Sequence, residues 1–298
     1  MNLYLVLCYF VIYAFLGWCT EVIYATVNTG KFVNRGFLNG PLCPIYGFGV
    51  VTIVILLMPV KENLGILFFG SVILTSVLEL VTGWLLEKIF HTRWWDYSNT
   101  PFNIGGYICL KFSIMWGIAC MVILVIIHPV IREFVSTINF KAGKIILGVA
   151  LATIAVDFTA TVQTVLNLNR QLRQINAAAS KIKALSDEIG EILYSESIAM
   201  IEKSEELKTT FMEQKMSINE LMDGKISEAN ESIVKLKAAL TEKTSKMNSD
   251  RLLHTKKLED LMNRSFFGQK RLLNAFPSLK SNSYTRALEE LKKKILTK

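Results

Sequence analysis

Hydrophobic positions divide the 298-residue chain into an apolar half and a polar half. Five apolar stretches come first, at about residues 3–27, 42–60, 64–90, 106–131 and 145–169. A helix needs about 20 apolar residues to cross the hydrocarbon layer, because its backbone amides must be bonded within their own segment. The pattern predicts an all-α, polytopic membrane protein with about five transmembrane helices in residues 1–166, the second of them short after Pro44.

In the polar half, the apolar residues follow one another at spacings of three and four. One such run is Leu168, Leu172, Ile175, Ala179 and Ile182. An average spacing of 3.5 residues is typical of a coiled coil, although each internal glycine, such as Gly190, weakens a helix by roughly 1 kcal/mol. We therefore expect an interrupted coiled coil at residues 167–276, folded as a hairpin or self-associated, and a short basic C-terminal helix at residues 277–298.

The charged residues support the same division. Residues 1–166 carry 9 Lys/Arg and 7 Asp/Glu, whereas residues 167–298 carry 24 and 18. Basic residues of short loops mark the cytoplasmic side, and eight of them fall on one side of the predicted spans against four on the other. This bias predicts a plasma-membrane protein with its N-terminus outside and its tail in the cytoplasm. The tail's charges nearly balance, which argues against nucleic-acid binding.

Cysteine and histidine spacing gives no sign of a metal or redox site. The five cysteines are Cys8, Cys19, Cys43, Cys109 and Cys120, with no C-x-x-C pair among them, and the three histidines are scattered. We therefore predict no metal, no cofactor and no disulfide framework.

Four acidic residues interrupt the apolar stretches and need a physical reason, because a charge in the bilayer interior costs about 2.5–3.5 kcal/mol on insertion scales. They are Glu21, Glu79, Glu87 and Asp157. Each lies on a polar stripe of its helix, and such stripes should face one another, with Lys111 as counter-charge. One interpretation is an inward-open cavity for a cation, a proton relay or a polar solute; the other is that the acids only fix helix packing.

The segment 35–47 combines glycines and prolines with an uncharged, apolar composition after Arg35. Its Gly40, Pro41, Cys43, Pro44 and Tyr46 are the residues of interest. Such a segment does not form a regular helix, yet it is too apolar for an ordinary exposed loop. A re-entrant element with free backbone groups facing a cavity fits both facts, and a tight loop entering the second helix is the alternative. Cys43 is expected to be a small buried residue rather than a nucleophile.

A second unusual segment, residues 91–97, follows the third apolar stretch. Its tandem tryptophans and tyrosine are typical of an interfacial aromatic belt, while Arg93 and Asp96 are close enough in sequence to pair. Asn103 then leads back toward the membrane. The segment is either a membrane anchor or a lid over a site. The candidate binding residues are therefore Arg35, Arg93, Asp96 and Asn103 together with Lys111 and the four acids.

Several of these motifs occur together in one known family. They are Gly17-Trp18-x-x-Glu21, the run from Arg35 to Gly47, Glu79 with Thr82-Gly83 and Glu87, Arg93-Trp94-Trp95-Asp96-Tyr97, Pro101-Phe102-Asn103 and Ser113-x-x-Trp116-Gly117. In this combination the chain resembles the putative ABC-transporter type IV, or CmpB-like, membrane family of bacteria over about residues 1–165. Gly105-Gly106 stands where the family pattern has an asparagine. The resemblance implies a multi-pass transporter permease and brings no substrate or catalytic residue with it.

Three functions are compatible with the sequence. The first is a permease component that binds a small polar or cationic solute in an acid-lined cavity. Because the chain lacks the G-x-x-x-x-G-K-[ST] phosphate loop, its ATPase would be a separate subunit. The second is a non-transporting scaffold that self-associates or recruits a protein partner through the coiled coil. The third, an intramembrane enzyme acting on a lipid-type substrate, has no nucleophile or metal set to support it, so we expect a non-enzyme.

Overall fold

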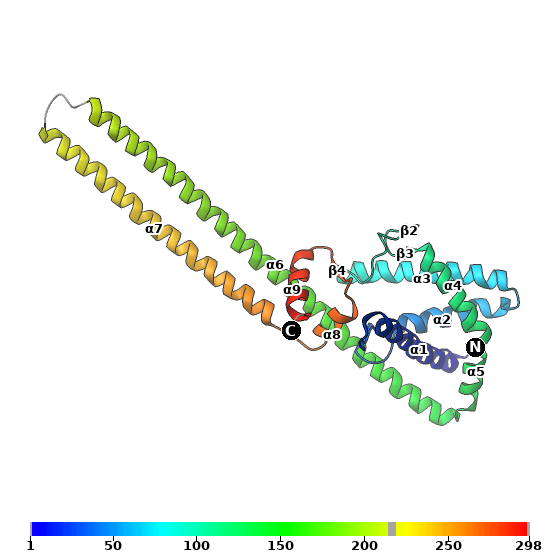
Figure 1. The fold of residues 1–298 in the computed structure, drawn as a ribbon. Coiled ribbons are helices and arrows are strands. Elements are labelled where there is room, and N and C mark those ends of the chain that lie inside the picture. The colour runs from blue at the N-terminus through cyan, green and yellow to red at the C-terminus, as the bar shows by residue number, and fades with distance from the viewer. Residues whose placement is uncertain (1, 214–218, 297–298) are drawn as a thin grey trace. The chain divides into compact units, whose positions relative to one another are not determined.

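The computed structural model describes residues 2–213 and 219–296, and it is almost entirely helical (Figure 1). It divides into an apolar unit, Met1–Leu172 with Ser265–Lys298, and an arm, Arg173–Arg264. Parts of the predicted transmembrane domain, coiled coil and C-terminal helix, at residues 1, 214–218 and 297–298, lie outside the described residues.

The apolar unit contains a helix for each of the five predicted stretches. These are α1 (Leu3–Thr29), α2 (Pro44–Leu57) with its 3₁₀ extension η1 (Met58–Val60), α3 (Leu64–Phe90), the continuous run of α4 (Leu110–Val122), the π-helical η2 (Ile123–Ile127) and α5 (His128–Thr137), and the first part of α6 (Phe140–Glu213). Four of them are long and apolar enough to cross a membrane, and Pro44–Val60 is a shorter apolar helix. The predicted all-helical class with membrane-spanning helices is confirmed.

Local sequence signals set several helix ends. The side chains of Asn2 and Asn63 accept hydrogen bonds from the backbone N–H groups of Leu5 and Ile66, which caps α1 and α3. Gly30 ends α1 in the left-handed region at φ 68°. These caps explain why the helix bounds follow the apolar stretches closely.

Close packing of α1 on α2 depends on a glycine. A Cβ atom at Gly17 would lie 2.3 Å from Cγ of Tyr46, so only glycine leaves room for this ring. Tyr9 and Tyr13 of α1 pack in a core cluster with Val50 and Val54 of α2. The motif that contains Gly17 therefore has a packing role.

We expect Gly17→Ala to destabilise the protein by roughly 1–3 kcal/mol, because the methyl group has to displace the Tyr46 ring. Gly148→Ala, at a position of α6 where an added Cβ meets nothing within 4 Å, is the matched control and should be neutral or slightly stabilising. Thermal unfolding of both variants in detergent measures the difference. Equal melting temperatures would contradict this packing role.

The residues after the arm return to the apolar unit as a C-terminal segment, residues 265–296. It contains α8 (Gln269–Ala275), β4 (Lys280–Ser281) and α9 (Thr285–Leu296). Strand β4 pairs antiparallel with β1 (Thr92–Arg93). A second small ladder joins β2 (Asn103–Ile104) to β3 (Ile108–Cys109) in the loop before α4.

This segment begins earlier than the sequence division at residue 277 predicts. The long helix α7 (Asn219–Asn263) ends well before Pro277, and Leu272 and Leu273 of α8 are fully buried. Lys292 of the predicted basic helix is also buried, and its Nζ donates to the carbonyls of Pro277 and Leu279. Apolar anchors in residues 265–276 therefore explain why this stretch belongs with the apolar unit.

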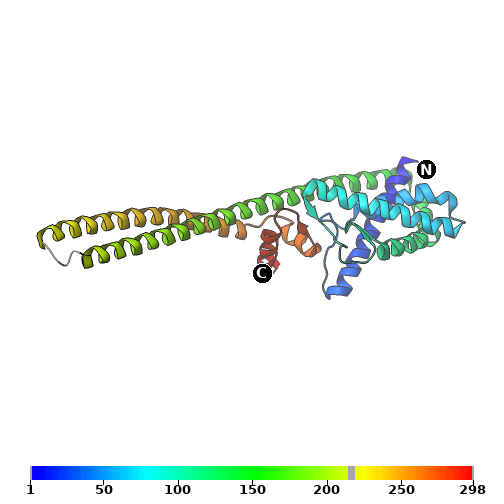
Figure 2. The ribbon, with the colours of Figure 1, turned by 90° about the horizontal axis from the view of Figure 1, so that it is seen from above.

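The arm consists of α6 beyond residue 173 and α7, which run side by side in opposite directions (Figures 1 and 2). Leu185 of α6 and Met247 of α7 are among its buried side chains. The predicted apolar run contains Ala179, but the buried residue here is Ala178 and Ala179 is exposed. At this point the buried face of α6 is therefore shifted by one residue from the predicted one.

Candidate functional site

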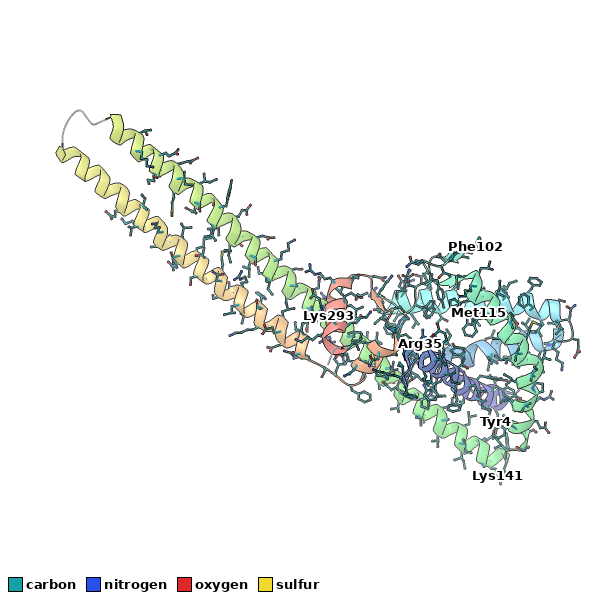
Figure 3. The ribbon with its side chains drawn as sticks, viewed as in Figure 1. Tyr4, Arg35, Phe102, Met115, Lys141 and Lys293 are labelled. Atoms are coloured by element: carbon teal, nitrogen blue, oxygen red, sulfur yellow. The ribbon has the colours of Figure 1, made fainter. Side chains whose placement is uncertain are left out.

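Most of the predicted site residues gather at one end of the apolar unit, which we call the polar end. It is built from the α1–α2 loop, the α3–α4 loop, the middle of α6's apolar part and the C-terminal segment. Figure 3 shows Arg35 at this end, near the C-terminal segment, whereas Tyr4 and Lys141 lie at the opposite end of the unit.

Asp157 of α6 binds the backbone of the α1–α2 loop. Its Oδ1 accepts hydrogen bonds from the backbone N–H and the side-chain Nδ2 of Asn39, at 3.0 and 2.9 Å, and its Oδ2 accepts from the Gly40 N–H at 2.7 Å. A Cβ atom at Gly40 would lie 3.1 Å from Oδ2, so the loop approaches this carboxylate closely. Asp157 therefore anchors a non-helical loop within the apolar unit.

Arg271 of α8 binds the carbonyl groups of the same loop. Its Nη1 donates to Gly36 O at 2.8 Å and its Nη2 to Phe37 O at 3.0 Å. Burial lowers the pKa of the Arg271 guanidinium, and the Asp157 carboxylate opposes this shift. The sequence predicts a re-entrant element whose free backbone groups face a cavity. In the structure, Arg271 binds the carbonyls of Gly36 and Phe37, and Asp157 binds the N–H groups of Asn39 and Gly40.

The rest of segment 35–47 starts the second helix. Cys43 is the N-cap of α2, Pro44 is its first residue and Pro41 precedes them in the loop. Cys43 is only 4% exposed, in agreement with a packing role. Proline at the first helical position needs no hydrogen-bond partner for its nitrogen, so the helix begins there.

Glu21 of α1 forms an ion pair with Arg35 of the α1–α2 loop. Its Oε2 lies 3.4 Å from Nε of Arg35, and its Oε1 accepts a hydrogen bond from the hydroxyl of Tyr46. The guanidinium of Arg35 also lies 5.1 Å from the ring centroid of Tyr24. Both carboxylate oxygens of Glu21 are therefore bound, one by Arg35 of the α1–α2 loop and the other by Tyr46 of α2.

Lys111, the predicted counter-charge, is exposed, and its Nζ lies 5.9 Å from the Phe112 ring centroid. Within residues 2–213 and 219–296 it forms no ion pair with the acids. Asn103 shapes its own loop: it donates to the Thr100 carbonyl at 2.8 Å and accepts from the Gly106 N–H at 3.1 Å. The structure therefore does not bring Lys111 and Asn103 to the acids.

A network of charges joins the α3–α4 loop to the C-terminal segment. Nε of Arg93 lies 2.9 Å from Glu87 Oε2, and its Nη1 lies 3.5 Å from Asp96 Oδ1, which confirms the predicted Arg93–Asp96 pair. Lys280 Nζ lies 2.7 Å from Asp96 Oδ2, and Asn282 donates to Glu87 Oε1 at 2.8 Å. Sequence reasoning missed Lys280 and Asn282 because only the pairing of β1 with β4 brings them here.

Trp94 is the buried side chain of the tandem tryptophans in segment 91–97. It is 4% exposed, with ring centroids 5.1 Å from Phe37 and 4.8 Å from Phe276. Trp94 is therefore the centre of an aromatic cluster that joins both loops to the C-terminal segment, and it does not lie at the surface as an anchor.

Glu79 is bound differently from the other acids. Its Oε1 accepts a hydrogen bond from the Tyr97 hydroxyl at 3.1 Å. Its Oε2 is buried and has no hydrogen-bond partner in the described part of the chain. Nearby in sequence, Ser76 of α3 donates to Ser113 of α4 at 2.7 Å, which links these two helices.

We expect the attachment of β4 to resist mild acid. Lys280, together with Ser98, holds the pKa of Asp96 well below its usual range. A folded-state pKa below the unfolded value of about 3.9 stabilises at neutral pH, and the stabilisation is lost only as the pH falls from about 5 through the folded-state pKa. Hydrogen-exchange protection of residues 278–284, corrected for intrinsic rates, should thus stay constant from about pH 8 to 5. In Lys280→Gln the folded-state pKa of Asp96 moves back toward its unfolded value, so protection at neutral pH should be lower and its further loss in acid smaller. Protection already lost near pH 6 in the unaltered protein would contradict this assignment.

Comparison with known proteins gives one match. The model of the family described as putative ABC-transporter type IV matches residues 8–162, slightly more than half of the chain. No curated protein and no solved structure matches it. The matched region contains most of α1, all of α2 to α5, both loops of the polar end and the acids Glu21, Glu79, Glu87 and Asp157, whereas the arm and the C-terminal segment lie outside it. With its apolar helices and this match, the chain is a membrane protein that belongs to the putative ABC-transporter type IV family.

Proposed function

We propose that the protein is a membrane-anchored scaffold: the apolar unit holds both ends of the arm, and the arm binds a protein partner. The observation that carries this proposal is the return of the C-terminal segment to the polar end. There Arg271 binds carbonyl groups of the α1–α2 loop, Lys280 binds Asp96, and Asn282 binds Glu87. Three acids that the sequence places in a solute cavity, Glu21, Glu87 and Asp157, are bound by protein groups. The chain also joins the apolar unit both before and after the arm.

The arm carries an apolar patch suited to a partner. Four large apolar side chains of α6 are exposed within nine residues: Leu193, Tyr194, Ile198 and Ile201. Tyr194, Ile198 and Ile201 follow one helix face at i, i+4 and i+7. Contiguous exposed apolar groups on a polar helix are typical of interaction sites, so this arm patch is the proposed binding surface.

The family suggests the class of partner. A transport system of the ABC type needs an ATPase, and this chain has no phosphate-binding loop of the G-x-x-x-x-G-K-[ST] type. We therefore propose a cytoplasmic protein of such a system, its ATPase subunit first, as the partner. This requires the orientation that the loop charges predict, with the N-terminus outside and the arm in the cytoplasm.

The test compares substitutions in the arm patch with a substitution of the intramembrane acid Glu79. Full-length protein, an Ile198→Lys/Ile201→Lys variant and a Glu79→Gln variant are purified from membranes of the source organism in mild detergent. A Glu202→Lys variant, changed at an exposed polar position of the same helix, is the matched control. We expect one partner at fixed stoichiometry that is lost only from the Ile198/Ile201 variant, because two lysines on the arm patch would have to be buried unpaired.

Complementation of a deletion strain by the same variants separates the functions. A scaffold requires the Ile198/Ile201 variant to fail and Glu79→Gln to succeed. The reverse pattern would overturn the scaffold proposal and support the second candidate, a permease component. That candidate is favoured by one observation, the buried and unpartnered Oε2 of Glu79, which leaves an acceptor for a proton, a cation or a polar solute.

A further inference from the structure

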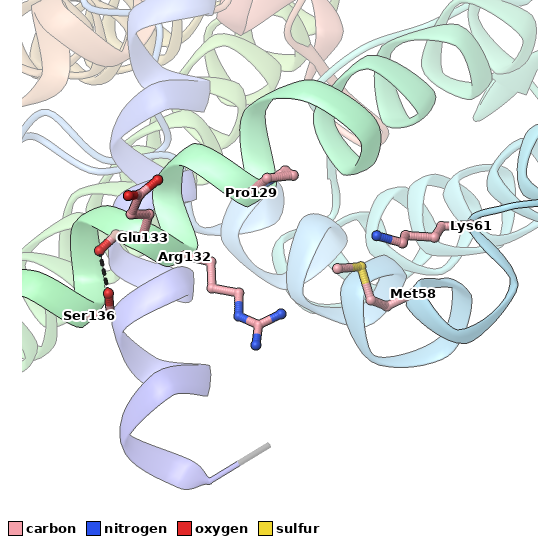
Figure 4. A pocket seen from close by; sticks show the side chains of 6 residues that line it. All are labelled: Met58, Lys61, Pro129, Arg132, Glu133 and Ser136. Atoms are coloured by element: carbon pink, nitrogen blue, oxygen red, sulfur yellow. Dashed lines mark hydrogen bonds between the residues drawn. The ribbon is translucent and has the colours of Figure 1, made fainter.

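The apolar unit has a hollow at the end opposite the polar end (Figure 4). It is lined by Met58, Lys61, Pro129, Arg132, Glu133 and Ser136. These residues come from two places in the chain, η1 with the turn after it and the helix α5. Its position is independent of the contacts used for the scaffold proposal.

The hollow lies where apolar helices end. Lys61 follows η1 directly and precedes α3, which begins at Leu64, so it occupies the turn between two apolar helices. Leu57 and Val135 are buried in the core cluster beneath this region. Charged residues at the ends of membrane helices lie at the depth of the lipid headgroups, so both cations of the hollow are within reach of lipid phosphate.

The two cations point into the hollow. Figure 4 shows Lys61 reaching into it from the turn after η1 and Arg132 from α5, whereas the carboxylate of Glu133 points away from Lys61. The contact of Lys61 with Glu62 is loose, at 3.8 Å, and the Glu62 side chain is 89% exposed. The guanidinium of Arg132 forms no hydrogen bond or ion pair with any described residue, so its donors remain available.

We propose that this hollow binds the phosphodiester of a membrane phospholipid, with the phosphate between Lys61 and Arg132. A guanidinium matches phosphate oxygens with paired N–H donors, and an ammonium adds a second positive charge. Exposed apolar side chains of the same helices, Leu56, Val130 and Phe134, offer a surface for acyl chains. Free inorganic phosphate shares the headgroup chemistry but would leave this apolar surface unused.

Native mass spectrometry of the detergent-purified full chain tests the site. The probes are phosphatidylglycerol, phosphatidylethanolamine and inorganic phosphate, each added separately. Each of Lys61→Gln and Arg132→Gln should reduce the retained phosphatidylglycerol about fivefold, the factor for one basic residue at the headgroup depth. A Lys141→Gln/Lys144→Gln variant, changed at two exposed cations near the start of α6, should retain it unchanged.

A conservative pair keeps the test valid if a glutamine variant is unstable: Lys61→Arg and Arg132→Lys preserve both charges and should retain lipid. Equal retention by the unaltered protein and the double glutamine variant would overturn the proposal. So would equal losses in the Lys141/Lys144 control, or binding of inorganic phosphate with no retention of either lipid. Stronger retention of phosphatidylethanolamine than of phosphatidylglycerol, with the same loss in the glutamine variants, would also support the site, because both lipids carry the phosphodiester.

Discussion

Arg271→Ala should release the C-terminal segment from the polar end while the long helices stay intact. The substitution removes the donors to Gly36 O and Phe37 O, so these two carbonyl groups lose the hydrogen bonds that Arg271 supplies. Losing two hydrogen bonds to a charged group costs roughly 2–3 kcal/mol, so local opening of residues 269–282 should become on the order of 30-fold or more frequent.

Cys43 offers a direct readout of this opening. Its thiol is buried in the loop next to the carbonyls that Arg271 binds, and Arg271 lies within electrostatic range of it. Maleimide labelling of Cys43, followed by peptide mass spectrometry, should therefore accelerate in Arg271→Ala. Lys270→Ala, at the exposed neighbouring position, is the control and should label like the unaltered protein. Unchanged labelling in both variants, with unchanged hydrogen exchange in residues 269–282, would show that Arg271 does not hold the segment.

The helices of the apolar unit could be predicted because their signal is local. An apolar run of about 20 residues has few alternatives to a membrane helix, and capping residues such as Asn63 fix where it begins. The same local signal identified residues 35–47 as irregular. It also showed that the backbone groups of this loop need partners other than a helix.

The partners of that loop could not be predicted, because they are far away in sequence. Gly36 and Arg271 are 235 positions apart, and Asp96 and Lys280 are 184 apart. Lys111 looked like the counter-charge because it lies close to the apolar stretches in sequence. Arg271 and Lys280 lie in the polar half, where nothing in the sequence distinguishes them from the other basic residues. Only the return of the chain to the apolar unit after the arm brings Arg271 and Lys280, rather than Lys111, to the polar end.

Asp157→Ala should be the most destabilising single change at the polar end. The carboxylate accepts from both the backbone N–H and the side chain of Asn39 and from the Gly40 N–H, and alanine leaves all three donors without an acceptor. We expect a loss of about 3–5 kcal/mol, or roughly 10 °C in melting temperature. Asp157→Asn should lose less, because one oxygen remains while the new NH₂ group faces a donor. Thr153→Ala, which removes only a hydroxyl bonded within its own helix, is the control.

The effects of Asp157→Ala and Arg271→Ala should not add, and this separates loop anchoring from solute binding. Both side chains hold the same loop, one through its N–H groups and the other through its carbonyl groups. Once either is removed the loop is free to move, so the second change should cost less than it does alone. Melting temperatures of the two single variants and the double variant give the coupling. If Asp157 instead served a solute, Asp157→Asn would leave stability near that of the unaltered protein, and the two losses would be independent.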